Sequence, residues 1–349
     1  MPRELRRVCW CDPGITRRRA GSGWVYLGPQ GRRVTDPETL ERIRSLVIPP
    51  AWTEVWICPI PNGHIQAVGL DARGRRQYIY HPRWRVRRDQ AKFDCMVAFA
   101  RALPDLRCTV TDQLACRDDL SRDRVLACAV RLLDEGFFRV GSERYAKENA
   151  SFGLATVLKT HVKVQKPSNL LFDYPAKSGR RRIQSIVDPE VFGIVSRLKA
   201  RRGGGPELLA FREGGRWVDV RSSDINHFIR QHAAGEFSAK DFRTWGATVL
   251  AAVALGVSTE VPSERARDRA VVRAVKEVSH YLGNTPAVAR RSYIDPRVID
   301  FYHQGTTIDP TLALGQQEGT GMRDALEAAV LDLLEGATAH SSRRAARAS

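Results

Sequence analysis

Hydrophobic and polar residues alternate in short stretches along the first part of the chain. Three of these stretches lie at residues 23–27, 54–58 and 64–68, and glycine, proline and asparagine separate them. Alternation with a period of two residues, bounded by turn-forming residues, is typical of β-strands. Pro61-Asn62-Gly63-His64 has the composition of a hairpin turn. The pattern therefore predicts a small antiparallel β-rich domain over residues 1–88.

The hydrophobic residues change to a helical spacing after a short basic segment at residues 84–89, which marks the predicted domain boundary. Beyond Ala91 they recur on one face of a helix, at Phe93, Met96, Val97 and Ala100. Ser121 is the predicted N-cap of the next helix, because its hydroxyl accepts a free backbone N–H. Further helices are predicted at residues 151–160, 188–200, 224–233, 240–255 and 263–282.

Three stretches inside this helical region alternate like β-strands, at residues 161–164, 169–174 and 181–187. A turn at residues 175–179 joins the last two, so a small antiparallel sheet is expected within a helical domain at residues 89–318. Residues 319–349 are predicted to form one amphipathic helix followed, from Ser341, by a basic disordered tail. The expected fold class is α+β.

The chain carries a large excess of positive charge. Its 56 lysine and arginine residues against 39 aspartate and glutamate residues give a formal net charge of +17 at pH 7. Such an excess favours a polyanionic partner, nucleic acid first and an anionic membrane surface second. No apolar run approaches the roughly 20 residues that span a bilayer, and no apolar segment follows the basic N-terminus as in a secretion signal. The sequence therefore predicts a cytoplasmic protein without a membrane segment.

Metal and nucleotide sites have no strong signature in the sequence. The seven cysteines all lie at or before Cys128, and Cys9 and Cys11 form the only close pair. Without a second pair at zinc-finger spacing, reduced thiols are the preferred interpretation and a metal site is the alternative. The glycine-rich loop at residues 201–206 lacks the Lys-Ser/Thr ending of a phosphate-binding P-loop. We therefore expect chemistry without a nucleotide cofactor and without a metal.

A tyrosine follows two arginines closely near the end of the helical domain. Residues 280–293 read His-Tyr-Leu-Gly-Asn-Thr-Pro-Ala-Val-Ala-Arg-Arg-Ser-Tyr, in which glycine ends one helix and Thr-Pro begins the next. Tyr293 beside Arg290 and Arg291 suits a phenol held against a phosphate. Taken alone, this stretch favours a structural interpretation, in which Tyr293 anchors the helix and the arginines face solvent.

Cleavage of a phosphodiester without a metal requires three kinds of group. A nucleophile must lie in line with the leaving oxygen, cations must neutralise the non-bridging oxygens, and an acid must protonate the departing alkoxide. Arginine suits the second role because its planar fork contacts two oxygens and stays charged. Lysine suits the third role because burial and neighbouring cations lower its pKa.

Three other segments supply candidate cations. Arg139 lies in Phe-Phe-Arg-Val-Gly-Ser-Glu-Arg-Tyr at residues 137–145, just after a predicted helix end, and Lys177 lies at the tip of the predicted hairpin. Lys240 and Arg243 lie in Lys-Asp-Phe-Arg-Thr-Trp at the start of a helix, where free N–H groups add to a positive field. Each candidate has a structural alternative: a capping arginine, an exposed turn lysine, or an arginine that pairs with a buried carboxylate.

The four motifs, taken together and in this order, resemble those of type IB DNA topoisomerases, most closely the poxvirus-like and bacterial branch. They are Phe-Phe-Arg-Val-Gly-Ser-Glu-Arg-Tyr, Asp-Tyr-Pro-Ala-Lys-Ser-Gly, Lys-Asp-Phe-Arg-Thr-Trp, and Leu-Gly-Asn-Thr-Pro followed by a tyrosine. The resemblance extends over nearly the whole chain, with a β-rich N-terminal domain before a helical catalytic domain. It implies an enzyme that relaxes supercoiled DNA.

The resemblance also implies a role for each motif residue. Tyr293 is expected to attack a DNA phosphate, forming a 3′-phosphotyrosyl bond and releasing a 5′-hydroxyl. Arg139 and Arg243 are expected to bind the non-bridging oxygens, and Lys177 to protonate the leaving 5′ oxygen with assistance from Arg139. Asn284 stands where many family members have histidine. An amide donates a hydrogen bond but carries no charge, so Asn284 is expected to stabilise the transition state without transferring a proton.

Further DNA contacts are predicted in both domains, at Lys240, Tyr145, Arg75, Tyr78 and His64. Basic and aromatic residues alternate at residues 69–82, which suits sequence-independent contacts with a phosphate backbone. The two domains of a monomer are expected to close around the duplex, in the cytoplasm at the nucleoid. Because the phosphotyrosyl bond stores the energy of the broken phosphodiester, religation is expected to need no ATP.

Two other functions fit part of the pattern. Tyrosine recombinases use a similar set of arginine, lysine and tyrosine, but they usually carry His-x-x-Arg where this chain has Lys240-x-x-Arg243. A β-rich N-terminal domain also fits recombinases poorly. A non-catalytic DNA-binding protein would use the basic surface alone, and net charge does not distinguish it from an enzyme.

Overall fold

The computed structural model describes residues 4–116, 120–258, 263–309, 311–312 and 320–347. Packing divides the chain into two compact units, Met1–Lys92 and Phe93–Ser349. The predicted α+β fold class is confirmed. An antiparallel sheet forms the centre of the first unit, and the second unit is mainly helical with small sheets.

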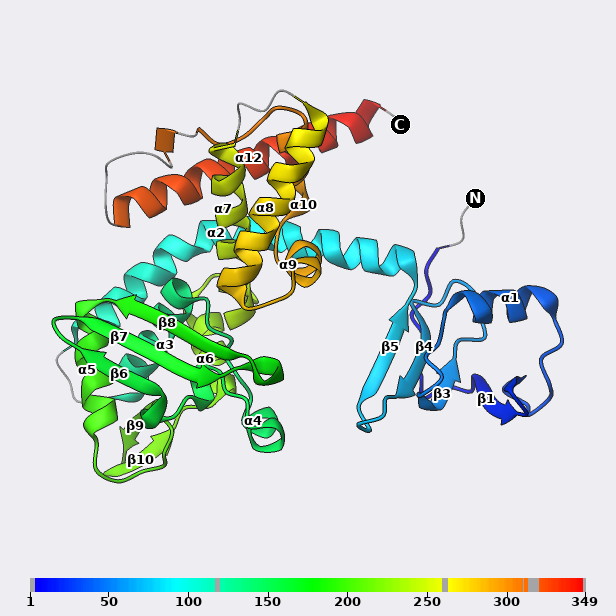
Figure 1. Ribbon diagram of the computed structural model, residues 1–349, viewed down its shortest axis with the longest axis horizontal. Coiled ribbons are helices and arrows are strands. Elements are labelled where there is room, and N and C mark those ends of the chain that lie inside the picture. Colours follow the sequence, from blue (N-terminus) through cyan, green and yellow to red (C-terminus); the bar gives the residue numbers. More distant parts are fainter. Residues whose placement is uncertain (1–3, 117–119, 259–262, 310, 313–319, 348–349) are drawn as a thin grey trace. The chain divides into compact units, whose positions relative to one another are not determined.

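The first unit is built on a five-stranded antiparallel sheet with the strand order β2-β1-β3-β4-β5 (Figure 1). Its elements are β1 (Ile15–Ala20), β2 (Gly23–Leu27), α1 (Pro37–Ser45), β3 (Thr53–Ile57), β4 (Ile65–Leu70) and β5 (Arg76–Tyr80). The predicted strands correspond to β2, β3 and β4, and the predicted hairpin turn joins β3 to β4. The sequence pattern did not reveal β1, because three consecutive arginines at residues 17–19 hide its alternation.

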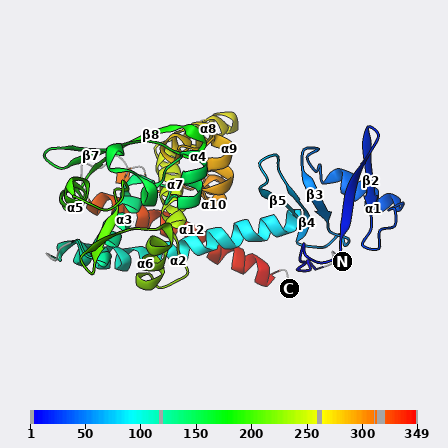
Figure 2. The ribbon, with the colours of Figure 1, turned by 90° about the horizontal axis from the view of Figure 1, so that it is seen from below.

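Alternate residues of the central strands pack on opposite faces of this sheet. Ile57 and Ala67 pack with Ile43 of helix α1, which covers one face (Figure 2). Trp56 and Val68 belong to a separate cluster on the other face. The period of two residues therefore produces a sheet with hydrophobic packing on both sides.

Helix α2 (Pro82–Ala115) begins earlier than its apolar spacing indicated. The helical pattern is recognisable only from Ala91, because the first turns are rich in arginine. Proline suits the first helical position, since its missing N–H would have no partner there. The predicted boundary segment at residues 84–89 consequently lies inside a helix, and the two units divide between Lys92 and Phe93.

Helices form most of the second unit. They are the greater part of α2, then α3 (Arg122–Gly136), α4 (Glu143–Asn149), α5 (Pro189–Ala200), α6 (Ser222–His232), α7 (Ala239–Gly256), α8 (Glu264–Leu282), α9 (Pro286–Ser292), α10 (Pro296–His303) and α12 (Thr320–Arg347). Ser121 is at the N-cap position of α3, as predicted, but its side chain makes no capping hydrogen bond. The helices predicted at residues 188–200, 224–233, 240–255 and 263–282 are confirmed as α5 to α8.

Two small sheets complete the second unit. Strands β6 (Val162–Gln165), β7 (Asn169–Pro175) and β8 (Arg181–Val187) form the predicted antiparallel sheet in the order β6-β7-β8. The β7–β8 pairing runs from Asn169 opposite Val187 to Pro175 opposite Arg181, so a tight turn closes one end of the hairpin. Strands β9 (Ala210–Glu213) and β10 (Arg216–Asp219) form a hairpin that was not predicted.

The prediction of a helix at residues 151–160 is wrong. Two 3₁₀ turns, Leu154–Thr156 and Lys159–His161, occupy this segment. The N–H groups of Leu154 and Ala155 donate to the carbonyls of Arg139 and Val140, so they are not available for a local helix.

Two other predictions also require correction. Residues from Ser341 were expected to be disordered, but helix α12 continues through Arg347. Cys9 and Cys11 were expected to be thiols, but they form a disulfide. Their Cα atoms lie 5.1 Å apart, which is within the range that a disulfide spans.

Candidate active site

Arg139 lies in the short connection that follows helix α3. Phe137 ends the helix in the left-handed conformation, with φ of 51°. Its ring packs so closely on Gly246 of α7 that a Cβ there would lie 2.7 Å away. The Arg139 carbonyl accepts a 2.8 Å hydrogen bond from the Leu154 N–H. These contacts hold the backbone on both sides of Arg139.

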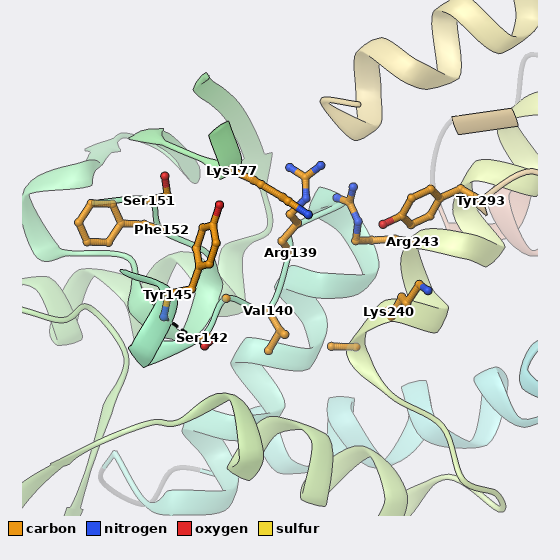
Figure 3. A pocket seen from close by; sticks show the side chains of 12 residues that line it. Arg139, Val140, Ser142, Tyr145, Ser151, Phe152, Lys177, Lys240, Arg243 and Tyr293 are labelled. Carbon is orange, nitrogen blue, oxygen red and sulfur yellow. Dashed lines mark hydrogen bonds between the residues drawn. The ribbon is translucent and has the colours of Figure 1, made fainter. Parts of the chain in front are cut away.

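Lys177 lies at the tip of the β7–β8 hairpin. The turn is tight, and both Ser178 and Gly179 have positive φ values, 66° and 70°. The β7 strand is anchored by Tyr174, whose ring stacks on Phe138 with 6.3 Å between the ring centroids. The lysine side chain extends from the turn toward the guanidinium groups of the site (Figure 3).

Arg243 lies near the start of helix α7 and is only 3% exposed. Its guanidinium donates to the carbonyl of Phe137 and, at 2.9 Å, to the carbonyl of Leu282 at the end of α8. Burial lowers the pKa of Arg243 to about 10, and the charge of Arg139 contributes to the same shift. The side chain still carries its charge at pH 7. Among the described residues, Arg243 has no carboxylate partner, unlike the structural alternative considered for it.

Tyr293 directly follows helix α9. Thr285 caps the start of this helix, and the Tyr293 N–H donates to the Ala289 carbonyl at its end. The Tyr293 carbonyl accepts a 3.2 Å hydrogen bond from the Thr248 hydroxyl of α7. The tyrosine backbone is therefore fixed both to its own helix and to the helix that carries Arg243.

The phenol of Tyr293 lies in a positive environment. Arg243 Cζ is 5.4 Å and Lys240 Nζ is 6.0 Å from the centroid of its ring. Burial raises the pKa of the phenol, but the neighbouring cations Arg243, Lys240 and Arg139 together lower it by more, so the pKa lies below the ordinary value of 10. A lower pKa makes the phenolate, which is the stronger nucleophile, accessible at lower pH.

Asn284 contacts Arg139 directly. The Arg139 guanidinium donates to Asn284 Oδ1, which assigns the amide orientation because a guanidinium cannot accept a hydrogen bond. The amide nitrogen Nδ2 is buried and has no hydrogen-bond partner among the described residues, and the same is true of Arg243 Nε. Buried donors without partners are costly, so both are suited to a ligand that brings acceptor oxygens.

Three arginines converge on the last carbonyl groups of helix α8, and we call them the α8-end arginines. Arg139 donates to Gly283 O at 3.3 Å, Arg182 to the carbonyls of His280 and Tyr281, and Arg243 to Leu282 O. The carbonyls at a helix C-terminus lack helical partners and carry partial negative charge. Arg182 was not predicted as a site residue, because main-chain acceptors have no sequence signature.

The functional side chains surround one cavity of about 360 Å³. It is lined by Arg139, Val140, Gly141, Ser142, Tyr145, Ser151, Phe152, Lys177, Ala239, Lys240, Arg243 and Tyr293. Figure 3 shows that the phenol of Tyr293 points toward Arg243, with Arg139 and Lys177 on the far side of Arg243. The exposed Arg290 and Arg291 are not among the lining residues. Asn284 is not among them either, but its side chain contacts Arg139, which is.

The remaining predicted DNA contacts lie in the first unit. Arg75 forms a 2.8 Å ion pair with Asp71, and the exposed ring of Tyr78 stacks beside another tyrosine of β5. His64 accepts a 3.1 Å hydrogen bond from the Val8 N–H through Nδ1, and burial lowers its pKa. The hydrogen bond from Val8 gives His64 a structural role within the unit. It leaves Nε2 as the ring nitrogen that can donate a hydrogen bond to DNA.

The described ranges contain neither a cluster of metal-ligating side chains nor a membrane-spanning helix. No group of three or more histidine, cysteine, aspartate or glutamate residues there is arranged to hold a metal ion. No helix in these ranges is both long enough and apolar enough to cross a membrane.

Comparison with known proteins gives matches over nearly the whole chain. The model of the eukaryotic DNA topoisomerase I catalytic core matches residues 81–304, and that of the bacterial DNA topoisomerase IB N-terminal domain matches residues 23–71. The chain is 30% identical to DNA topoisomerase 1B of Acanthamoeba polyphaga mimivirus over 299 residues, 83% of this chain and 87% of that protein. It is 24% identical to DNA topoisomerase 1B of vaccinia virus (strain Copenhagen) over 247 residues, 69% and 74% of the two chains.

Proposed function

Because the chain belongs to the type IB DNA topoisomerases, we propose that Tyr293 is the nucleophile with which it cuts and rejoins one DNA strand. The family makes this chain an isomerase that acts on DNA. One observation supports the assignment of Tyr293 above the others. Its side chain lines the same cavity as Arg139, Lys177 and Arg243, and the pKa of its phenol is lowered there.

In the proposed reaction, the Tyr293 oxygen bonds to phosphorus while the bond between phosphorus and the 5′ oxygen breaks. The phenol releases its proton to solvent, and Lys177, assisted by Arg139, gives a proton to the leaving oxygen. The 3′ phosphate stays on Tyr293 until the 5′-hydroxyl attacks it after the duplex has rotated. Since one phosphoester replaces another at each step, ATP is not required.

The α8-end arginines support the proposed stabilisation of charge. Arg139 and Arg243 are held in place before DNA arrives, so little reorganisation is needed when they bind the non-bridging oxygens. The unpaired Nδ2 of Asn284 is the proposed third donor, without proton transfer. Fixed guanidinium charges can provide the neutralisation that a metal ion provides elsewhere, and we propose that no metal is required.

Further contacts and the setting of the reaction are also part of the proposal. Lys240 and Tyr145 would contact DNA next to the scissile phosphate, and their place in the cavity lining supports this. Arg75, Tyr78 and His64 would contact the duplex from the first unit. The enzyme would act as a monomer in the cytoplasm, at the nucleoid.

Relaxation of a supercoiled plasmid, with EDTA and without ATP, tests this function. The parent protein should relax the plasmid, and Tyr293→Phe should neither relax it nor form a covalent adduct with DNA, although it should still bind DNA. Tyr302→Phe is the matched control, because that buried phenol donates to the Ser258 carbonyl and lies outside the cavity lining. Relaxation by Tyr293→Phe would disprove the assignment, and a requirement for added metal would disprove the metal-free mechanism.

A further inference from the structure

Arg182 links the hairpin that carries Lys177 to the helix end that precedes Tyr293. We infer that Arg182 is a positioning residue, which holds the proton donor in line with the nucleophile and the scissile phosphate. This inference rests on the proposed roles of Lys177 and Tyr293. It concerns a residue that lies outside the cavity lining and acts through others.

The contacts of Arg182 run from a strand to a helix terminus. The side chain leaves strand β8, and its two terminal nitrogens donate to the carbonyls of His280, at 3.3 Å, and Tyr281 in the last turn of α8. No other hydrogen bond in the described part of the chain joins β8 to α8. Removal of this side chain would therefore leave the hairpin without a polar attachment to that helix.

On the hairpin side, the position of Arg182 controls the turn. Arg182 pairs with Tyr174 across the sheet, next to the last paired residues before the turn that presents Lys177. Tyr174 is itself buried against Phe138, one residue before Arg139. A shift of Arg182 is therefore expected to move the Lys177 turn relative to Arg139.

On the helix side, the same contact lies immediately before the segment that carries the nucleophile. Gly283 ends α8 with φ of 61°, and a Cβ at this position would lie 3.2 Å from Arg182 Nη1. Asn284 follows, and helix α9 then leads to Tyr293. The link thus joins the two segments whose relative position decides whether acid, phosphorus and nucleophile lie in line.

The chemistry of the link requires an arginine. A guanidinium fork can reach two successive carbonyls at once, whereas a lysine ammonium offers a single donor centre. The negative end of the α8 dipole stabilises the Arg182 cation but carries only a partial charge, so it does not neutralise the guanidinium. Arg182→Lys should therefore restore part of the function that Arg182→Ala loses.

Arg181 is the matched control on the same strand. Its side chain is 70% exposed and forms a 2.6 Å ion pair with Asp173. Neighbouring strand residues face opposite sides of the sheet, so Arg181→Ala removes a similar charge without touching α8.

The test compares two leaving groups in single-turnover cleavage of a DNA duplex. One substrate has the natural bridging 5′ oxygen, and the other has sulfur at that position. A thiol has a pKa of about 8.5, so a thiolate leaves without the proton that an alkoxide needs. We expect Arg182→Ala to cleave the oxygen substrate about ten- to a hundredfold more slowly than the parent. With the sulfur substrate its rate should come within about threefold of the parent. Arg181→Ala should match the parent on both substrates.

Three outcomes would overturn the inference. The first is parental cleavage of the oxygen substrate by Arg182→Ala. The second is an equal defect on both substrates, which would indicate that Arg182 acts on the phosphate or on the nucleophile. The third is a defect of Lys177→Ala that sulfur does not relieve, because then the proposed general acid is wrong and positioning through it is wrong as well. If Arg182→Ala does not fold, Arg182→Met, which keeps the length of the stem, replaces it with the same expectations.

Discussion

Two groups of arginines in the second unit are held in opposite ways. In the first group, which we call the α12 clasp, Arg107 of α2 and Arg323 of α12 both form ion pairs with Asp134 of α3 and with Glu327 of α12. In the second group, the α8-end arginines donate to main-chain carbonyls, and none of their hydrogen bonds in the described ranges goes to a carboxylate.

The difference separates arginines whose charge is neutralised by carboxylates of the protein from arginines whose charge remains available to a polyanion. Paired carboxylates cancel the charge of Arg107, and they raise its pKa although burial alone would lower it. A helix C-terminus supplies only about half an elementary charge, so the α8-end arginines keep a net positive field. Burial and mutual repulsion lower the pKa of Arg243, which is the electrostatic cost of that arrangement. A phosphate would relieve this repulsion.

The largest expected effect follows from the removal of one α8-end arginine. Arg243→Met should slow single-turnover DNA cleavage by about 10²–10³-fold, because it removes a preorganised donor for the transition state. The free energy of unfolding should fall by only about 1–3 kcal/mol, since two carbonyls lose a partner. Parallel cleavage assays and urea titrations measure both quantities, and Arg230→Met, an exposed arginine of α6, is the control. A variant that cleaves at the parental rate would contradict the distinction between the two groups.

The reverse result is expected in the α12 clasp. Asp134→Asn should reduce the free energy of unfolding by about 1–3 kcal/mol, because two partly exposed arginines lose one of their carboxylate partners and keep Glu327, while single-turnover cleavage changes little. Asp324→Asn should change stability by less than about 1 kcal/mol, since that side chain is 65% exposed. If Asp134→Asn instead lowered cleavage as strongly as Arg243→Met, the clasp would be part of the catalytic site.

The clasp also predicts a specific pH dependence. Burial raises the pKa of Asp134, but Arg323 and Arg107 lower it by more, so it lies below the ordinary value. The unfolded chain then takes up a proton on Asp134 at a higher pH than the folded protein does. The stabilisation is complete above about pH 4 and is lost as the pH falls below it. Asp134→Asn should lack this part of the acid dependence of unfolding.

The sequence indicated which side chains line the cavity, but it did not indicate the hydrogen bonds that fix their positions. Tyr293, Arg139, Lys177 and Arg243 were identified because their four motifs, taken together and in order, resemble one family, and the structure brings the four side chains to one cavity. Arg182 was not identified, because its partners are carbonyl groups that any residue supplies. The sequence did contain one indication of a role for Arg182. Arg181 and Arg182 are neighbours in a predicted strand, so their side chains must face opposite sides of the sheet, and only one of them can face solvent freely.

The fold shows the same limit. Helices with a regular apolar face were predicted correctly, since that face is buried whatever its partner is. The segment at residues 151–160 was predicted as a helix because its pattern does not reveal that N–H groups of Leu154 and Ala155 bond to the Arg139 connection. Prediction from local periodicity therefore fails where a segment distant in sequence accepts the hydrogen bonds. Here that segment contains Arg139, one of the catalytic candidates.

The smallest expected effect tests how Lys240 differs from the α8-end arginines. Its ammonium lies 6.0 Å from the ring of Tyr293 and is at the exposed edge of the cavity. Lys240→Met removes a charge that lowers the pKa of the phenol, so that pKa should rise and the pH profile of cleavage should move to higher pH. At this separation a solvent-screened charge changes the ratio of phenolate to phenol by about threefold. Cleavage on the rising limb of the pH profile should therefore slow by about that factor.

Lys276→Met, an exposed lysine of α8, is the matched control and should leave the profile in place. Titration of tyrosinate absorbance, taken as a difference from Tyr293→Phe, measures the pKa directly. An unchanged pKa with slower cleavage would mean that Lys240 acts on DNA and not on the phenol. A loss as large as that of Arg243→Met would place Lys240 on the scissile phosphate with the arginines, because a screened charge at the rim cannot produce it.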